Sequence, residues 1–252
     1  MTGPGRGTVI VTGGGRGIGA ATARLAAERG YDVCLGYRRD ATAAAEVVAG
    51  IEALGRRAVA VPGDVAIEAD VLRLFETAAR EVGRITALVN NAGILEGQMR
   101  VDEMDAARFG RVFATNITGA FLCAREAVRR MSTRHGGEGG AIVNVSSMAA
   151  QLGSPGEYVD YAASKGAIDS LTIGLAREVA DEGIRVNAVR PGVIYTDIHA
   201  SGGEPGRVDR VKAHVPMRRG GEAIEVARAI LWLLSDDASY STGTFIDVSG
   251  GR

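Results

Sequence analysis

Short apolar runs alternate along the chain with longer stretches in which apolar residues recur at helical spacing. The apolar runs, rich in valine and isoleucine, predict buried strands, and the longer patterns predict helices. The expected strands cover residues 9–11, 33–35, 59–61, 87–89, 142–145, 186–189 and 244–248. The expected helices cover about 17–29, a stretch that ends near 55, then 67–82, 105–131, a stretch around 161 that reaches about 180, and 224–234.

Apolar strands that alternate with helices are typical of an α/β fold, in which a parallel sheet is covered by helices on both faces. We therefore expect a doubly wound parallel sheet of about seven strands. No linker or change of composition divides the chain, so a single domain over 1–252 is predicted. The pattern breaks down at about 196–221, and we interpret this stretch as a substrate lid. A solvated surface loop with some partner contact explains it equally well.

Composition narrows the classes of function. Hydrophobic residues make up 46% and charged residues 23% of the chain, as in a globular protein with a sizeable core. The formal net charge of −1, without long charged blocks, gives no indication of nucleic-acid or membrane binding. No signal peptide is recognisable, so we expect a cytoplasmic protein. Cys34 and Cys123 are predicted to be buried thiols, and the three histidines lack the spacing of metal ligands, so no metal is expected.

A tyrosine and a lysine stand four residues apart, at Tyr161 and Lys165, which places them on one face of a helix. An ammonium beside a phenol favours the phenolate, so Lys165 is expected to lower the pKa of Tyr161 toward the range of acid–base catalysis. Only two of the 29 basic residues are lysines, Lys165 and Lys212, so the use of lysine here is notable. A solvated Tyr–Lys pair on a helix face is the alternative.

Glycines cluster in the stretch from Thr12 to Gly19, between the first expected strand and the first expected helix. Such glycines allow a tight turn and let the backbone approach a pyrophosphate at the helix N-terminus. The spacing is G-x-x-x-G-x-G rather than the commoner G-x-G-x-x-G. We interpret the loop as a dinucleotide-binding site, and a turn that serves only helix–strand packing is the alternative.

Five motifs in order make the chain resemble a classical short-chain dehydrogenase/reductase, with its Rossmann fold. They are the glycine stretch 12–19, Asn90-Asn91-Ala92-Gly93, Ser146-Ser147, Tyr161 with Lys165, and Pro191-Gly192. The resemblance covers essentially Thr8 to Gly251. Residues 153–161 and 199–221 look most like bacterial glucose-1-dehydrogenase-like oxidoreductases, whose substrates are mostly unassigned.

The resemblance implies a catalytic role for four residues. Tyr161 would be the acid/base, and Lys165 would lower its pKa and hold the nicotinamide ribose. Ser147 would hydrogen-bond the substrate oxygen, and Asn116 would help hold a water chain to solvent. The family usually spaces its serine and tyrosine by thirteen residues, whereas Ser147 and Tyr161 are fourteen apart, so we expect the extra residue in the loop 153–157. Ser146 is the less favoured candidate.

The end of the second expected strand decides the cofactor. An acidic residue there holds the ribose of NAD, whereas an arginine accommodates the 2′-phosphate of NADP. The chain has Arg38 at this point and Arg16 in the glycine loop, so we expect NADP(H), although Arg38 and Arg39 could be solvated charges and either cofactor could bind. Asp40 is predicted to be an N-cap.

Further cofactor contacts follow from the resemblance. The implied residues are Gly13, Gly17, Ile18 and Gly19 in the glycine loop, Asp64 and Val65 at the adenine, Asn91 and Gly93 along the ribose, and Ile194 and Thr196 at the carboxamide, besides Arg16, Arg38, Tyr161 and Lys165. Asp64 could instead be a helix cap, and Pro191-Gly192 an ordinary turn.

The sequence thus predicts an NADP(H)-dependent oxidoreductase that transfers a hydride between nicotinamide and a carbonyl or secondary alcohol. An NAD-linked sugar or alcohol dehydrogenase is the first alternative, and a 3-oxoacyl reductase fits the same motifs. A non-catalytic NADP(H) sensor is a third possibility. The basic residues of 196–221 suggest a polar or anionic substrate. The family is usually tetrameric or dimeric, so a homotetramer or homodimer is expected.

Overall fold

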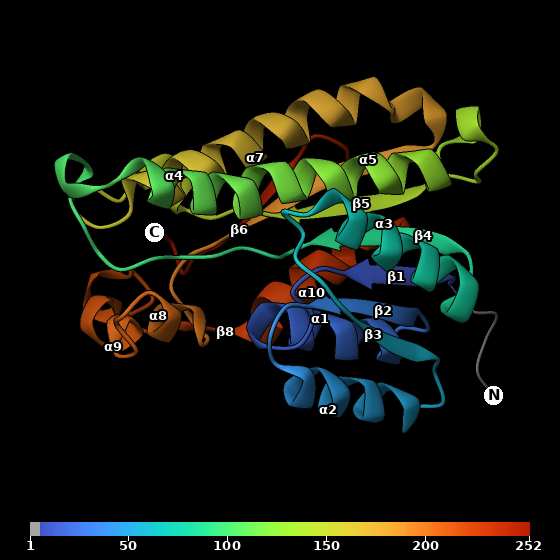
Figure 1. Cartoon of the computed structure of the whole chain (residues 1–252), viewed down its shortest axis with the longest axis horizontal. Coiled ribbons are helices and arrows are strands. Elements are labelled where there is room, and N and C mark those ends of the chain that lie inside the picture. Colours follow the sequence, from blue (N-terminus) through green and yellow to red (C-terminus); the bar gives the residue numbers. More distant parts are fainter. Residues whose placement is uncertain (1–5) are drawn as a thin grey trace.

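The computed structural model describes residues 6–252, and its centre is a sheet of seven parallel strands (Figure 1). The strand order is β3-β2-β1-β4-β5-β6-β9, and every neighbouring pair in it is parallel. The strands are β1 (Thr8–Val11), β2 (Asp32–Tyr37), β3 (Ala58–Pro62), β4 (Ile85–Asn90), β5 (Gly140–Val145), β6 (Ile184–Pro191) and β9 (Phe245–Val248). The predicted doubly wound sheet is confirmed.

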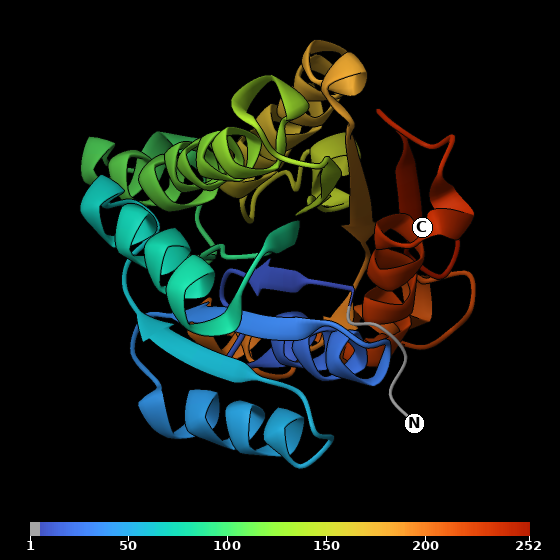
Figure 2. The same cartoon turned by 90° about the vertical axis from the view of Figure 1, so that its right-hand side faces the viewer.

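Helices cover both faces of the sheet, as Figure 2 shows end-on. On one face lie α1 (Gly17–Glu28), α2 (Ala41–Glu52) and α10 (Ala223–Leu234), and on the other α3 (Glu68–Thr77), α5 (Gly119–Met131) and α7 (Val159–Glu178). Each group packs on its own cluster of buried apolar side chains from the strands. The central strands are mainly apolar because both of their faces are buried.

The long helix expected over 105–131 is interrupted by one wider turn. α4 (Ala106–Phe113) passes into a π-helical turn, Ala114–Thr118, and then into α5. α3 continues similarly into a π-helical turn, Ala78–Val82. A π turn inserts one extra residue, which changes the direction of the side chains that follow it. Asn116, predicted to be catalytic, lies within the first of these turns.

The stretch 196–221 is more regular than the sequence predicted. It contains α8 (Ile198–Ser201), α9 (Arg207–Val211) and a 3₁₀ turn, Lys212–His214. The two-stranded pair of β7 (Ile194–Tyr195) and β8 (Gly221–Glu222) joins its two ends. Helices of four or five residues are too short to show a helical period, which explains why the pattern looked irregular.

The chain reverses its direction of winding between β1 and β4. Strands β1, β2 and β3 proceed toward one edge of the sheet, and β4, β5 and β6 proceed toward the other. At such a switch point the loops after two adjacent strands diverge, which leaves a crevice at the carboxyl ends of the strands. Among residues 6–252, no helix has the length and apolarity that crossing a membrane requires.

Candidate active site

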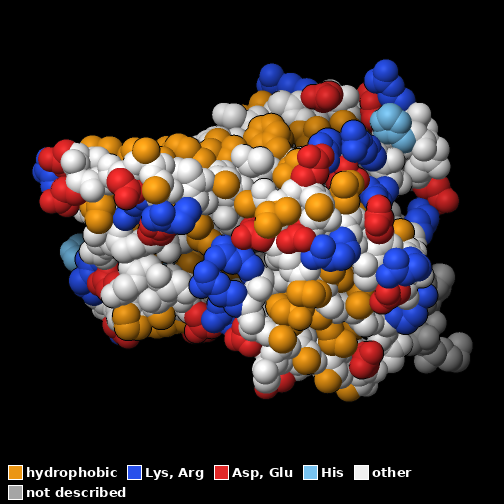
Figure 3. All heavy atoms as spheres, viewed as in Figure 1, with side chains coloured by type: hydrophobic (Ala, Val, Ile, Leu, Met, Phe, Trp, Pro, Cys, Tyr) orange, Lys and Arg blue, Asp and Glu red, His pale blue; other side chains and the backbone are white. Residues whose placement is uncertain are grey.

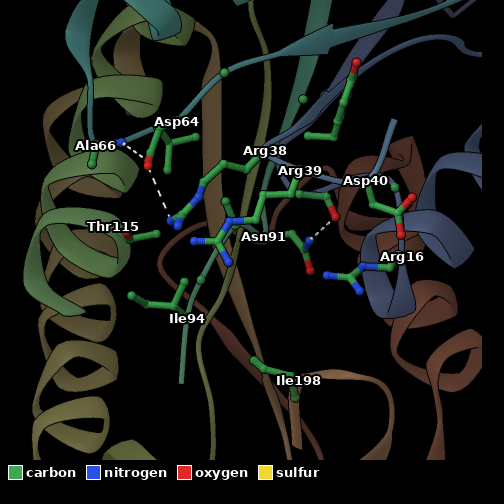
Figure 4. Close-up of a pocket in the computed structure, with 18 of the residues that line it drawn as sticks. Arg16, Arg38, Arg39, Asp40, Asp64, Ala66, Asn91, Ile94, Thr115 and Ile198 are labelled. Carbon is green, nitrogen blue, oxygen red and sulfur yellow. Dashed lines mark hydrogen bonds and ion pairs between the residues drawn. The ribbon is translucent and has the colours of Figure 1, made fainter. Parts of the chain in front are cut away.

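A cleft of about 770 Å³ opens at this switch point (Figure 4). Its lining comes from the glycine loop, from the ends of β2 and β3, and from the segment after β4. It includes most of the predicted cofactor contacts: Gly13, Arg16, Gly17, Ile18, Arg38, Asp64, Val65, Asn91, Gly93 and Thr196. Four predicted contacts are not among its lining residues: Gly19, Tyr161, Lys165 and Ile194, of which Ile194 is buried in the apolar core.

The glycine loop has almost no room for side chains. A Cβ atom at Gly19 would stand 2.2 Å from the carbonyl oxygen of Gly13, so α1 lies directly against the loop. Gly13 and Gly17 have φ angles of 63° and 54°, in the region that favours glycine. The glycines therefore serve helix–strand packing and also leave backbone exposed to the cleft, so the two interpretations of the loop are compatible.

Asn91 holds the glycine loop in place. Its Nδ2 atom donates to the carbonyl oxygens of Thr12 at 2.8 Å and Gly13 at 3.2 Å. The buried Thr12 hydroxyl in turn accepts from the backbone N–H groups of Asn91 and Ala92, each at 2.9 Å. The side chain expected along the ribose is thus already engaged by the protein, and it fixes the shape of the cleft.

Three arginines surround one end of the cleft. Arg16, Arg38 and Arg39 all line it, and Figure 4 shows Arg38 reaching toward Asp64, with Nη1 and Oδ2 3.4 Å apart. Sequence reasoning assigned Arg39 no role in binding, although its position beside Arg38 was the available signal. Asp40 accepts from the N–H of Ala43 at 3.0 Å, so the predicted N-cap is confirmed.

Lys165 and Tyr161 lie one turn apart on α7, as predicted. The ammonium of Lys165 donates to the carbonyl oxygen of Val145 at 2.7 Å and lies 5.6 Å from the centre of the Tyr161 ring. Lys165 is only 4% exposed, and burial lowers its pKa to about 8. Gly93 packs against the ammonium, since a Cβ atom at this position would lie 3.6 Å from Lys165 Nζ.

The pKa of Tyr161 differs from the sequence expectation. Burial raises it to about 12, because the phenolate loses its hydration, and a hydrogen bond with the Ser147 side chain opposes this rise. The expectation that the ammonium of Lys165 lowers this pKa is therefore not met in this arrangement. The phenol stays protonated at neutral pH, so Tyr161 is arranged as a proton donor.

The two serines after β5 have different partners. Ser147 interacts with Tyr161 and accepts from the N–H of Ala149 at 3.1 Å. Ser146 instead donates to Asp169 Oδ1 at 2.6 Å. Ser147 is thus the serine beside the phenol, in agreement with the preference for it over Ser146.

Asn116 joins the segment after β4 to α7. Its Oδ1 accepts from the N–H of Ile94 at 2.8 Å, and its Nδ2 donates to Ile94 O at 3.0 Å and to Ser164 Oγ at 3.1 Å. A Cβ at Gly93 would lie 3.5 Å from its Oδ1, so Asn116 and Lys165 meet at the same glycine. The π turn brings its buried amide to this point.

The two cysteines lie away from this chemistry. Cys34 and Cys123 are free and buried, as predicted, and burial raises the pKa of each thiol to about 12. Among residues 6–252, the structure contains no cluster of three or more His, Cys, Asp or Glu side chains arranged to hold a metal.

The fold and the site together define a nucleotide-dependent oxidoreductase, and comparisons identify the family. The family model described as enoyl-(acyl carrier protein) reductase matches residues 13–252. The chain is 60% identical to the uncharacterized oxidoreductase YgfF of Escherichia coli K12, over 96% of this chain and 98% of that protein. It is 36% identical to glucose 1-dehydrogenase 2 of Bacillus subtilis, over 97% and 93% of the two chains.

A solved structure shows the same arrangement of the chain. A short-chain dehydrogenase from Burkholderia cenocepacia, in complex with NADP, superposes with a TM-score of 0.89 at 34% identity and covers 96% of both chains. The chain belongs to the short-chain dehydrogenase/reductase family, as its motifs predicted. It is an oxidoreductase that acts on CH–OH or carbonyl groups with a nicotinamide nucleotide.

The cleft fits such a nucleotide. The glycine loop exposes its backbone to the cleft, and a Cβ atom at these glycines would cover that backbone. The cleft volume of about 770 Å³ is within the range of cofactor sites. Positive guanidinium groups lie at one end, where phosphate can be bound. At the other end, Gly93 leads to the ammonium of Lys165, whose two remaining N–H donors are suited to ribose hydroxyls.

Proposed function

We propose that the protein is an NADP(H)-dependent oxidoreductase that interconverts a carbonyl compound and a secondary alcohol. The observation that carries the proposal is the group of three guanidinium side chains, Arg16, Arg38 and Arg39, around the cleft beyond β2. A 2′-phosphate bears about two negative charges, and guanidinium forks bind such a group bidentately. An arginine rather than an acidic residue at position 38 disfavours NAD, the alternative cofactor.

The bound nucleotide supplies or accepts the hydride. Tyr161 holds a proton at its Oη atom and donates it to the substrate oxygen, and Ser147 hydrogen-bonds the same oxygen as charge develops there. The Lys165 ammonium lies 5.6 Å from the centre of the phenol ring, and Asn116 ties α7 to the segment after β4. A phenol that is protonated at neutral pH can donate its proton to a carbonyl oxygen, as reduction requires.

The charges of the segment 196–221 change the expected substrate. Within the described residues, Arg207 and Arg210 pair with Glu157 and Glu204, Lys212 pairs with Asp209, and Arg219 pairs with Glu225. Arg218 donates to the carbonyl oxygen of Ala213. With most of its positive charges paired with acids, the segment favours a neutral polar substrate over the anionic one that its basic composition also suggested. We keep the proposal that it is the substrate lid.

Cofactor choice is tested by titration of nicotinamide fluorescence with NADPH and NADH. We expect NADPH to bind more tightly, and Arg38→Ala to weaken NADPH binding by at least about tenfold while it leaves NADH binding nearly unchanged. Arg80→Ala is a matched control, because that exposed arginine pairs with Glu81 and neither residue lines the cleft. Equal or tighter binding of NADH to the wild type would overturn the choice of NADP(H).

Catalysis is tested separately with Tyr161→Phe. The variant should bind NADPH as the wild type does and lose carbonyl reduction by a factor of about a thousand or more, since general acid catalysis is removed. Turnover at the wild-type rate would exclude Tyr161 as the acid, whereas a wild type that binds NADPH but reduces no carbonyl compound would favour the non-catalytic sensor.

The homotetramer or homodimer stays a prediction. Half-exposed apolar side chains on α5, α7 and α10, such as Phe121, Ile173 and Trp232, support it. On the face in Figure 3, charges of both signs are interspersed, and no large patch of one sign appears. Light scattering of the eluted protein measures the oligomeric state directly. The cytoplasmic location likewise stays a prediction.

A further inference from the structure

A carboxylate lies behind the catalytic lysine, outside the residues that line the cleft. Asp169 follows Lys165 by one turn of α7 and its side chain is 16% exposed. One of its oxygens accepts from Ser146 Oγ at 2.6 Å, and the other accepts from Arg190 Nε at 3.0 Å. Both oxygens are therefore engaged, one by the end of β5 and the other by β6.

These contacts join β5 to α7 at the level of Lys165. Ser146 directly follows Val145, whose carbonyl oxygen accepts from the Lys165 ammonium at 2.7 Å. The hydroxyl of Ser146 also lies 3.2 Å from the carbonyl oxygen of Lys165. The next residue is Ser147, beside Tyr161. A shift of Ser146 would consequently move Ser147 and Lys165 relative to each other, and positioning errors of this kind slow a reaction strongly.

The carboxylate also sets the charge around Lys165. The charged and titratable groups that face this region are Tyr161 and Asp169 on α7, Arg190 on β6 and Asp247 on β9. The Arg190 side chain is 14% exposed, lies 3.6 Å from Asp247 and covers the Phe245 ring at 3.8 Å. Charges that are mostly buried interact more strongly than charges in water, because the local dielectric constant is lower. Burial lowers the pKa of Lys165, and the negative charge of Asp169 opposes that effect.

We propose that Asp169 is a positioning residue of the reaction, which holds Ser146 against the backbone of Lys165 and places a negative charge one turn of α7 from this lysine. The proposal rests on the proposed function. Sequence reasoning assigned no role to Asp169, because its position one turn beyond Lys165 indicates only a shared helix face. Its contact with the end of β5 requires the folded sheet.

The two lysines of the chain allow a direct test that needs neither cofactor nor substrate. Protein labelled with ¹³Cε-lysine gives two signals, which Lys212→Arg assigns. We expect Asp169→Asn to lower the titration midpoint of Lys165 by about one pH unit, since an opposite charge has been removed. Asp169→Glu, which keeps the charge, and Asp247→Asn, which removes the other acid beside Arg190, should leave the midpoint within about 0.3 pH units of the wild type.

Kinetics then connects the charge to the reaction. With NADPH and a reducible ketone as substrates, kcat should fall at alkaline pH as Lys165 loses its proton. In Asp169→Asn this fall should occur at a lower pH, shifted by the same amount as the titration midpoint of Lys165. At pH 8 this corresponds to roughly a fivefold loss of kcat, and at pH 6 to much less. Ser146→Ala should lower kcat at every pH without moving the midpoint, because it removes the contact but keeps the charge.

Three results would overturn the proposal: an unchanged Lys165 midpoint in Asp169→Asn, an equal change in Asp247→Asn, or a kcat profile that does not follow the midpoint. If Asp169→Asn fails to fold, Asp169→Glu and Ser146→Ala carry the test through kcat alone. A downward shift of the alkaline fall of kcat in Asp169→Glu, which keeps the charge, would then refute the charge role. Failure of the proposed function is separate, since it appears as wild-type turnover in Tyr161→Phe whatever the Lys165 midpoint.

Discussion

Replacing Lys165 by methionine should stabilise the protein at neutral pH while it removes activity. Burial lowers the pKa of Lys165 from 10.5 to about 8, so the folded state resists protonation of this side chain more than the unfolded state does. A fall of this size corresponds to roughly 3 kcal/mol of unfavourable free energy at pH 7. Loss of the hydrogen bond to Val145 O offsets about 1–1.5 kcal/mol. The expected gain is about 2 kcal/mol.

The sign of the pH dependence follows from linkage. Because the folded-state pKa is depressed, the unfolded chain binds more protons than the folded protein between about pH 8 and 10.5. The wild type therefore gains stability as the pH rises through this window, and the methionine variant lacks that gain. By pH 9.5 the penalty has fallen to roughly 1 kcal/mol, and the two proteins should be nearly equal in stability.

Urea unfolding at pH 7 and pH 9.5, followed by far-UV circular dichroism, measures the difference. Lys212→Met is the matched control, since Lys212 is exposed and pairs with Asp209, and it should leave the unfolding midpoint nearly unchanged at both pH values. A Lys165→Met variant less stable than the wild type at pH 7 would refute the reasoning. So would a stability gain of the same size at both pH values.

Three further predictions concern the fold and the cleft. Gly19→Ala should abolish NADPH binding in the fluorescence titration, because its Cβ would stand 2.2 Å from a loop carbonyl oxygen. Arg108→Met should cost about 3–5 kcal/mol in urea unfolding, since it leaves buried Asp160 without its partner at 2.7 Å, and Asp160→Asn in the same chain should recover part of the loss. Cys34 and Cys123 should react with a thiol reagent only after denaturation, because burial raises the pKa of both thiols to about 12; labelling in the native protein would contradict this.

The sequence by itself determined the order and type of the main elements. Buried parallel strands are apolar on both faces, so runs such as Val9-Ile10-Val11 stand out without any knowledge of the fold. Local chemistry was equally readable: the N-cap at Asp40, the Tyr161–Lys165 spacing and the glycine loop depend on residues close together in the chain. Motif order then identified the family.

The tertiary structure decided what depends on residues far apart in the chain. The π turn at Asn116 and the short helices α8 and α9 follow from packing, because such short elements have no period of their own. The basic side chains of 196–221 suggest a polar or anionic substrate, and only the folded chain shows that most of them pair with Glu157 and other acids.

The protonation of Tyr161 and Lys165 shows most clearly what the sequence determines and what the tertiary structure decides. Spacing places an ammonium near a phenol, and from that alone the pKa of Tyr161 should fall. Burial reverses the direction, raising the pKa of Tyr161 to about 12 and lowering that of Lys165 to about 8. Desolvation depends on how many atoms from distant segments surround a group, and the sequence around Tyr161 contains no measure of that number.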